Sequence, residues 1–399
     1  MTPGVMSLMM SQESRKEVLG KMVERYRGRG RGGRSRLLDE VCELCGYGRK
    51  YAIKLLGGKT PIAGDGHRRG GPRPRYGEAE KPVLKAIWLS AEQPCGKRLK
   101  AAVPLWLPDY EREQGPLEAE LRGRVLQMSA ATLDRLLAPC RVSLGSRGRC
   151  GTRPGTLLRS QIPIRTEHWD VSGPGWLEAD TVAHCGESMA GDFCWSVTLT
   201  DVHTQWTEAR AVWNKGQYAV QERIAEVEAA LPFAILGFDS DNGGEFINWH
   251  LADYFALRQE AVAFTRSRAY RKNDNARVEQ KNWTHVRQLV GYGRLAEPAQ
   301  AERLNALYVQ EWNLFRNFYC PVMKHLRTEV EGSRKKRVYD QPATPFERLK
   351  ASAGVDPRQI ERLEALKATL HPFEMKRRIE KKLQRVLKAP GRTRLQAAA

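Results

Sequence analysis

Residues 174–292 hold five short apolar segments and three amphipathic segments in an order that constrains the fold. Three runs rich in apolar and β-branched residues come first, with a turn near Asp201–Thr204 between the second and the third. Two further apolar runs then alternate with stretches of helical periodicity. The chain is therefore expected to contain an α/β domain of order β-β-β-α-β-α-β-α. Its mixed sheet would have three antiparallel strands, then parallel strands with flanking helices.

Three carboxylates occupy defined places in this order. Asp180 lies on the first strand, Asp241 directly follows the fourth strand in GFDSDNGGEF, and Glu279 lies in the first turns of the last helix. Strand ends in open α/β sheets converge on one crevice, where a helix beside the sheet can present a third side chain. Carboxylate oxygens are the ligands that Mg²⁺ prefers. We therefore expect these three residues to be catalytic and to bind two Mg²⁺ or Mn²⁺ ions acting on a phosphodiester.

Other residues of this segment have competing interpretations. Asp239 shares FDSDNGG with Asp241, and the Asn-Gly that follows favours the second acid. His184 is expected in a loop or the core rather than at a substrate. Trp283 follows Glu279 by one helical turn, where it either packs in the core or stacks on a base, and core packing is favoured. Three more acids are expected to be solvated or to lie in a hairpin: Glu178, Asp201 and Glu245.

Net charge indicates the partner. The chain has 66 Lys and Arg against 46 Asp and Glu, a formal charge of +20 that attracts polyanions. No stretch approaches the roughly eighteen apolar residues of a spanning helix, and the first residues do not resemble a signal peptide. The 8 cysteines are scattered without a disulfide framework. We therefore expect a soluble intracellular protein that binds double-stranded DNA and no membrane.

Basic residues gather around Glu279. Cations beside a catalytic acid make sense when the substrate is a phosphate backbone. From this group, three side chains are expected to contact DNA: Arg271, Lys272 and Lys281.

Residues 1–60 are expected to form a helix-turn-helix region. The arginine-rich run 27–36 is either a solvated linker or an arm that lies against phosphate. Two amphipathic helices follow, around Leu37–Leu44 and Tyr51–Leu55, joined by a turn at Gly46–Gly48. The second would be the recognition helix, with three cations facing DNA: Arg49, Lys50 and Lys54. A purely structural helical hairpin remains the alternative.

Composition divides the rest of the chain into linkers and helical regions. They are residues 61–75, a linker; 76–140, a second helical domain that is either helix-turn-helix-like or purely structural; 141–165, a basic linker; 166–296, the catalytic core; and 297–399, a helical, basic C-terminal region. Within the last region, residues 331–349 suggest a loop with a basic cluster, and Pro372 breaks the final helices. The final basic segment either contacts the DNA backbone or forms a solvated helix.

The order of elements, with WLEAD, DSDNGGEF and NDNARVEQKN, resembles the catalytic core of retroviral integrases and bacterial insertion-sequence transposases of the DDE class. The resemblance covers about residues 165–295 and implies a ribonuclease H-like fold with Asp180, Asp241 and Glu279 as the metal ligands. Asn282 matches a frequent asparagine of that family, and we expect it at the DNA. The spacing before Glu279 is slightly longer than usual. Zinc-binding His and Cys pairs of retroviral N-terminal domains are absent, which favours the bacterial transposases.

The resemblance implies a DNA transposase that binds element ends, nicks them to expose 3′-hydroxyls and transfers those strands into target DNA. Two DNA ends need at least two active sites, so a homo-oligomer on DNA is expected, in the bacterial cytoplasm at the nucleoid. Two alternatives stay open. One is a ribonuclease H-like nuclease that cuts without joining, and the other is a non-catalytic DNA-binding repressor with a degenerate core.

Overall fold

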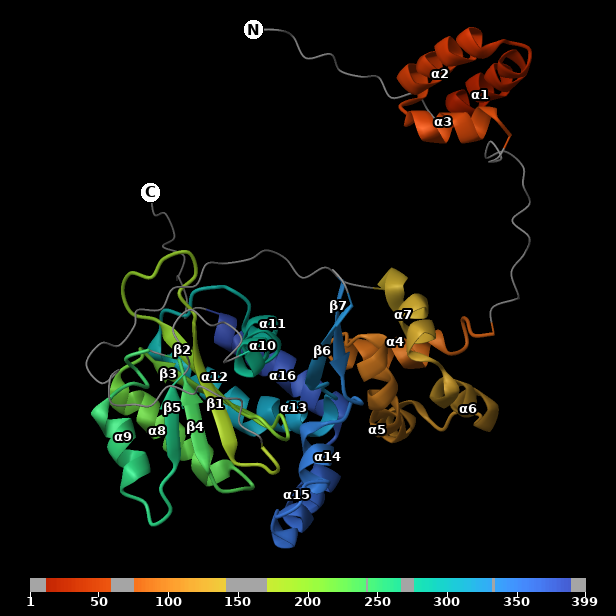
Figure 1. The fold of residues 1–399 in the computed structure, drawn as a ribbon. Helices are drawn as coiled ribbons and strands as arrows, with labels where there is room; N and C mark the ends of the chain where they lie inside the picture. The colour runs from red at the N-terminus through yellow and green to blue at the C-terminus, as the bar shows by residue number, and fades with distance from the viewer. Residues whose placement is uncertain are drawn as a thin grey trace, which may run out of the picture. The chain divides into compact units, whose positions relative to one another are not determined.

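The computed structural model describes residues 12–58, 75–140, 171–241, 243–266, 276–331 and 334–388. The chain divides into two compact units, Met1–Arg75 and Tyr76–Ala399 (Figure 1). The two expected linkers lie almost entirely outside the described residues, as do Arg271 and Lys272. Among the helices that the structure describes, none is long and apolar enough to cross a membrane.

The N-terminal unit contains three helices: α1 (Gln12–Arg27), α2 (Arg31–Cys45) and α3 (Arg49–Leu56). As predicted, a glycine turn joins the last two, and Gly46 ends α2 with a left-handed φ of 69° that favours glycine. The arginine-rich run is not a linker, because most of it belongs to the first turns of α2. Leu37, Leu38 and Val41 take the buried face of α2, which leaves the arginines exposed on the helix.

The second unit contains a five-stranded mixed sheet with strand order β3-β2-β1-β4-β5 (Figure 1). β1 pairs antiparallel with β2, and β2 with β3, whereas β4 runs parallel to β1 and β5 parallel to β4. This confirms the predicted element order and the mixed α/β class. The strands are β1 (Trp176–Ala183), β2 (Cys194–Asp201), β3 (Thr207–Trp213), β4 (Gly237–Ser240) and β5 (Ala263–Arg266).

The two faces of the sheet bury different partners. Leu177 and Ala179 of β1 pack in one core with apolar residues of α8 (Gln217–Ala230) and α9 (Trp249–Ala256). The alternate residues of β1 face the other way, because side chains alternate along a strand. That second face carries α10 (Ala276–Lys281), which continues as a π-helical turn, η2 (Asn282–Arg287), and the short α11 (Gln288–Val290).

Further helices extend the second face. They are α4 (Lys81–Ser90), α5 (Gly96–Gln114), α6 (Ala119–Gln127), α7 (Ala130–Leu137), α12 (Pro298–Leu307), the π-helical η3 (Tyr308–Trp312), α13 (Asn313–Tyr319), α14 (Pro345–Lys350), α15 (Pro357–Thr369) and α16 (Pro372–Leu387). The indole Nε1 of Trp106 in α5 donates to the Tyr319 carbonyl in α13 over 2.9 Å, in a core that both helical groups share. Ser129 caps α7, accepting from the Thr132 backbone N–H.

Helix α16 is a packed helix whose cations pair with acids of the same unit. Met375, Ile379 and Val386 are buried. Lys376 pairs with Glu92 and Arg377 with Glu113. The final basic segment is therefore neither a free tail nor a fully solvated helix up to Lys388, and only part of its charge is open to another partner.

Two strands outside the main sheet correct the expected loop at residues 331–349. β6 (His325–Glu331) and β7 (Arg334–Tyr339) pair antiparallel as a sheet of their own. The basic cluster of that segment lies on β7. Pro345 then begins α14, where Thr344 and Glu347 form a capping box.

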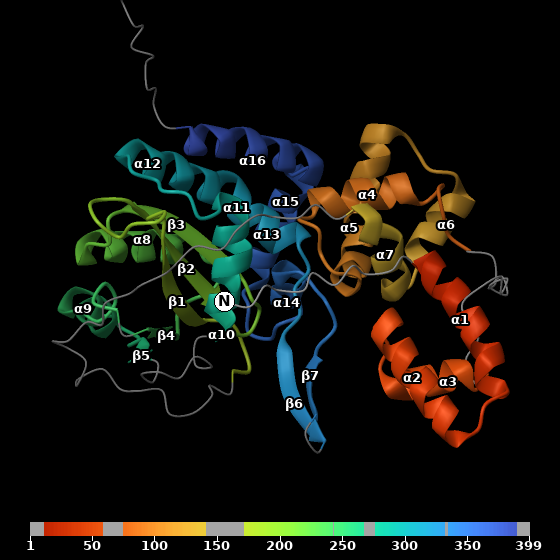
Figure 2. The same cartoon turned by 90° about the horizontal axis from the view of Figure 1, so that it is seen from above.

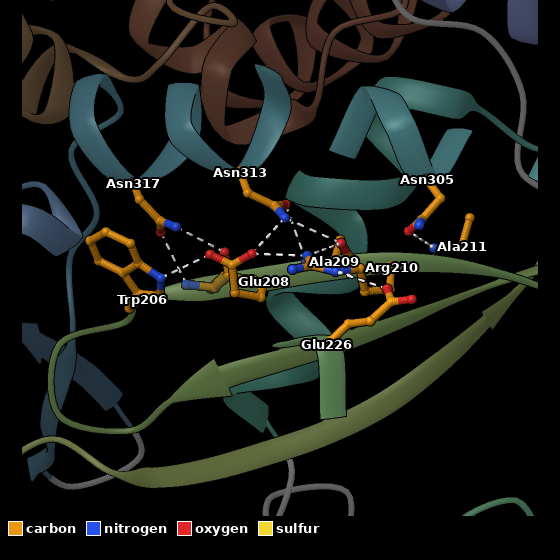
Figure 3. Close-up of polar contacts among 10 residues, drawn as sticks. Trp206, Glu208, Ala209, Arg210, Ala211, Glu226, Asn305, Asn313 and Asn317 are labelled. Carbon is orange, nitrogen blue, oxygen red and sulfur yellow. Dashed lines mark hydrogen bonds and ion pairs between the residues drawn. The ribbon is translucent and has the colours of Figure 1, made fainter. Parts of the chain in front are cut away.

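The edge strand β3 is closed by asparagine side chains from the helical layer (Figure 3). Asn313 accepts from the Ala209 N–H and donates to the Ala209 carbonyl, both over 3.2 Å. Asn317 makes the same pair of bonds with Thr207, and Asn305 accepts from the Ala211 N–H over 3.1 Å. An unpaired edge strand would otherwise present these groups to another chain.

Candidate active site

The sheet brings Asp180 and Asp241 to neighbouring positions. β1 and β4 run parallel, and the last paired residues of their register are Ala179 and Ser240. Each predicted acid directly follows the last paired residue of its segment, so Asp180 and Asp241 lie at the same end of this parallel pairing. Asp180 lies on the first strand and Asp241 directly after the fourth, as predicted.

Asp180 is fixed by a side chain from the last helix of the core. Its Oδ2 accepts from Asn282 Nδ2 over 2.6 Å, and its Oδ1 accepts from the Thr181 backbone N–H over 2.7 Å. Asn282 Oδ1 accepts in turn from Thr198 Oγ1 over 2.5 Å. Asn282 therefore ties the end of α10 to both β1 and β2. This contact gives Asn282 a role at the carboxylate itself, and its expected contact with DNA stays a prediction.

A second contact seats α10 on β1. The Val278 backbone N–H donates to Glu178 Oε2 over 3.3 Å. Glu279 lies between Val278 and Asn282 in α10, in the first turns of the helix as predicted. Its side chain lies outside the part of the chain that the structure describes.

Asp241 is a half-buried carboxyl group with a raised pKa. Burial is the main cause and raises the pKa of Asp241 to about 6, while a hydrogen bond from the Gly243 N–H over 2.9 Å acts in the opposite direction. The nearby Glu245 carboxylate raises this pKa further, and the Lys215 ammonium lowers it. A positive charge brought to this carboxylate would relieve the cost of its ionisation.

Glu245 is buried beside Asp241, contrary to its expected place among solvated or hairpin charges. Only 4% of its surface is exposed, and its Oε1 accepts from Thr181 Oγ1 over 2.9 Å and from Lys215 Nζ over 3.1 Å. Lys215 Nζ also lies 4.4 Å from the ring centroid of Trp195. A Cβ at Gly243 would stand 2.7 Å from the Glu245 carboxyl carbon, so a larger residue there would displace this carboxylate. The paired glycines of GFDSDNGGEF were the one signal of this close approach.

The remaining acids are also buried, which corrects the expectation for Glu178. Glu178 and Asp239 are neighbours in the parallel register, and both are inaccessible to solvent. Asp239 accepts from Thr265 Oγ1 over 2.6 Å within the sheet, whereas Asp241 stands beyond the end of the strand. The choice of Asp241 over Asp239 agrees with this geometry. Asp201 lies in the β2–β3 hairpin as predicted, but it is buried and accepts from backbone N–H groups of Gly175 and Thr204.

Three residues near Glu279 take positions that the sequence only partly predicts. Lys281, expected among the DNA-contacting cations, is 3% exposed and donates to the Gln205 carbonyl over 3.4 Å. Burial, with Arg316 nearby, holds the pKa of Lys281 well below its ordinary value of 10.5. Trp283 is 49% exposed, so the prediction of core packing is wrong. His184 is a core residue, as expected, and its Nε2 lies 2.8 Å from Ser196 Oγ.

The three cations predicted on the second helix of the N-terminal unit are all exposed on α3. Arg49 pairs with Asp39 and donates to Ser35 Oγ over 2.8 Å, so part of its charge is used within the unit. Among the described residues, Lys50 and Lys54 form no ion pair. The face of α3 is therefore basic, and its expected contact with DNA stays a prediction.

Metal binding by the three predicted acids stays a prediction. Among the His, Cys, Asp and Glu side chains that the structure describes, no group of three or more is arranged to hold a metal ion. Two of the three predicted ligands, Asp180 and Asp241, are placed at neighbouring strand positions. The third, Glu279, contributes only its helical position.

The comparisons with known proteins identify a relative without assigning a function. No protein-family model matches the chain. Over 347 residues the chain is 37% identical to the protein named "Uncharacterized protein y4rM" of Sinorhizobium fredii, an alignment that covers 86% of this chain and 97% of that protein. At this identity and coverage, the chain belongs to the same family as y4rM.

Proposed function

We propose that this protein is a DNA transposase of the DDE class, which nicks element ends and transfers their 3′ strands into target DNA. One observation carries the proposal: parallel strands β1 and β4 continue into Asp180 and Asp241, while Asn282 of the following helix binds Asp180. Glu279 precedes Asn282 by three residues, in α10. Three acids from three separate segments thus have positions suited to one site.

The sheet supports a ribonuclease H-like core within this proposal. Three antiparallel strands are followed by two parallel ones that join on the β1 side, giving the order β3-β2-β1-β4-β5. In that order β1 lies at the centre, with β4 beside it, so the acids of both strands reach the same part of the sheet. The resemblance of the WLEAD and DNGGEF segments to DDE cores agrees with this placement.

Asp180, Asp241 and Glu279 would hold Mg²⁺ or Mn²⁺, and the donor set fits such an ion. Carboxylate oxygens have several acceptor sites each, so the bonds that Asp180 accepts from Asn282 and Thr181 leave capacity for a cation. The raised pKa of Asp241 marks a carboxylate whose charge is poorly compensated by the protein alone. When bound, two such ions supply an activated nucleophile and stabilise the leaving oxygen.

The residues themselves have positioning roles in this mechanism. Asn282 sets the orientation of the Asp180 carboxylate, and the Thr181–Glu245–Lys215 contacts hold the loop that follows β4. The Gly243 N–H fixes one oxygen of Asp241.

The exposed cations Lys50 and Lys54 would bind the backbone of double-stranded DNA, the expected substrate of a protein with a net charge of +20. A homo-oligomer would supply the two sites that two element ends need.

The test compares Asp241→Asn with Asp253→Asn, a matched change at an exposed carboxylate on α9. Purified protein is incubated with Mg²⁺, supercoiled plasmid and a duplex that carries an element end, and joined and nicked products are separated on gels. The Asp241 variant should lose about 10²–10³-fold or more in joining rate, the usual effect of removing a group that stabilises developing charge. The Asp253 variant should keep the wild-type rate.

Other outcomes separate the alternatives. Nicked circles without joined product would indicate a nuclease. Duplex binding with neither product would indicate a repressor with a degenerate core. An Asp241→Asn variant that joins strands as fast as the wild type would refute the assignment of the site.

A further inference from the structure

The β6–β7 ribbon is uncovered on both of its faces. The two strands pair only with each other, in a two-stranded sheet separate from the main one. Leu326 and Val330 are 55% and 63% exposed, and Thr328, Lys335 and Arg337 are exposed as well. Figure 2 shows the ribbon projecting away from α13 and α14. A two-stranded ribbon with no covered face is marginally stable in water, so it gains most from a partner.

The base of this ribbon is held in place by the second unit. The Lys324 backbone N–H donates to Asp340 Oδ1 over 2.7 Å, and Arg348 of α14 pairs with Asp340 over 2.5 Å. Lys324 Nζ donates to the His203 carbonyl, in the β2–β3 turn of the main sheet, over 2.7 Å. The base of the ribbon is therefore fixed beside the main sheet, while the rest of the ribbon stays uncovered.

The two faces of the ribbon differ in charge compensation. On one face Glu329 pairs with Arg327 and Lys336. The register places Thr328 opposite Arg337 and Val330 opposite Lys335 on the other face. Within the described residues, neither Lys335 nor Arg337 forms an ion pair, and no carboxylate is their partner across the strands. We call this second face, made of Thr328, Val330, Lys335 and Arg337, the open face.

We propose that the open face binds double-stranded DNA, with Lys335 and Arg337 on backbone phosphates. The inference rests on the proposed function only in taking duplex DNA as the substrate. The major groove accepts a two-stranded β-ribbon, and uncompensated cations on such a ribbon match the phosphates that border the groove. Val330 and Thr328 offer the apolar and hydroxyl contacts that base edges accept.

A second copy of the chain is a poorer occupant. Edge-to-edge pairing would bring β7 of one copy beside a ribbon of the other, and Lys335, Lys336 and Arg337 follow one another on that strand. Consecutive cations on an edge strand oppose such pairing, as they do in natural sheets. The phosphates of duplex DNA would attract these cations, whereas a second ribbon would bring like charges close to them.

The test measures binding of the full-length protein to a fluorescein-labelled duplex of random sequence in EDTA, by anisotropy at several salt concentrations. The double variant Lys335→Gln/Arg337→Gln removes two charges from the open face. Arg358→Gln/Arg362→Gln removes two charges from an exposed part of α15 and is the matched control. The ribbon variant should flatten the slope of log affinity against log salt by about 1.8, since each phosphate contact contributes about 0.9.

The control should leave that slope unchanged, and Lys335→Arg/Arg337→Lys should restore it. Amide hydrogen exchange on the wild-type protein should show protection of residues 326–338 when the duplex is added, as a second readout that needs no variant. Equal slopes for ribbon variant and control, without protection of the ribbon, would overturn the proposal. So would a ribbon variant that changes the sedimentation mass of the protein and leaves DNA binding intact, because the ribbon would then join two copies. Because no divalent ion is present, a protein without joining activity can still pass this test.

Discussion

Replacing Asn313 by alanine should destabilise the second unit strongly, because the buried Ala209 N–H would lose its partner and two buried acceptors would each lose one bond. Asn313 Nδ2 donates to Glu208 Oε2 over 2.7 Å and to the Ala209 carbonyl, and its Oδ1 accepts from the Ala209 N–H (Figure 3). Glu208 keeps its bonds from Trp206 and Arg210, and the Ala209 carbonyl keeps a bond from Arg210 Nη1 over 2.9 Å. A buried donor left without a partner costs about 1–3 kcal/mol and each further lost bond about 1 kcal/mol, so we expect a loss of about 3 kcal/mol in the free energy of unfolding.

The measurement is urea unfolding followed by tryptophan fluorescence. All 10 tryptophans lie between residues 88 and 312, so the signal reports on the second unit alone. Asn305→Ala is the control, since Asn305 is half-buried and makes one bond to the same strand, from the Ala211 N–H over 3.1 Å. It should cost about 1 kcal/mol, the typical net value of one hydrogen bond.

Two results would refute this reasoning. If Asn313→Ala and Asn305→Ala lose the same free energy, the edge of β3 does not depend on the buried asparagine. If Asn313→Ala loses less than about 1 kcal/mol at an unchanged m-value, the Ala209 N–H finds another partner or water, and the edge closes by another route.

Two further predictions concern buried titratable groups. Lys281→Met should raise the free energy of unfolding at pH 7, because burial lowers the pKa of Lys281 and so disfavours its charged form in the folded protein. The salt dependence of DNA binding by this variant should equal that of the wild type. A weaker salt dependence would mean that Lys281 contacts DNA. Burial likewise lowers the pKa of His184 from 6.5 to about 3. Its contribution to stability is therefore complete above pH 6.5 and is lost as the pH falls towards 3, by about 1.4 kcal/mol per pH unit. In urea unfolding between pH 7 and 5, the free energy of unfolding should fall less steeply for His184→Gln than for the wild type. An equally steep fall in both proteins would mean that His184 is not held neutral in the folded state.

The order of elements could be predicted because each strand of the main sheet has at least one buried face. Apolar residues mark β1 to β5 in the sequence, and helical periodicity separates them. The β6–β7 ribbon was missed for the converse reason. Its residues bury neither face, so HLRTEVE and RKKRVY show the polarity of a loop. The arginine-rich run was misassigned because composition does not reveal that the helix of Leu37 and Val41 extends back to Arg31.

In the candidate site, local sequence singled out Asp180 and Asp241 as candidates but not the residues that contact them. Glu245 and Lys215 meet across thirty positions of chain through the loop after β4, and no short pattern encodes that contact. Burial of Glu245 follows from the shape of the loop, in which Gly243 leaves room for the carboxylate. The sequence positions of the two candidate acids could therefore be predicted, while the Glu245–Lys215 pair that holds the loop required the fold.

The last helix shows how far periodicity alone could have gone. Buried residues recur at Val278, Lys281, His285 and Leu289, a helical stripe that places Lys281 inside and leaves Trp283 outside. The basic composition of the segment concealed that stripe. The π-helical turn that begins at Asn282 widens the spacing of the residues after it. Asn282 can therefore reach Asp180 while His285, three residues on, packs among the C-terminal helices and offers its carbonyl to Trp312. The Val278 N–H binds the Glu178 carboxylate, and Asn282 binds the Asp180 carboxylate; both acids belong to β1. The helical turn that holds Glu279 is therefore fixed to β1 at both ends.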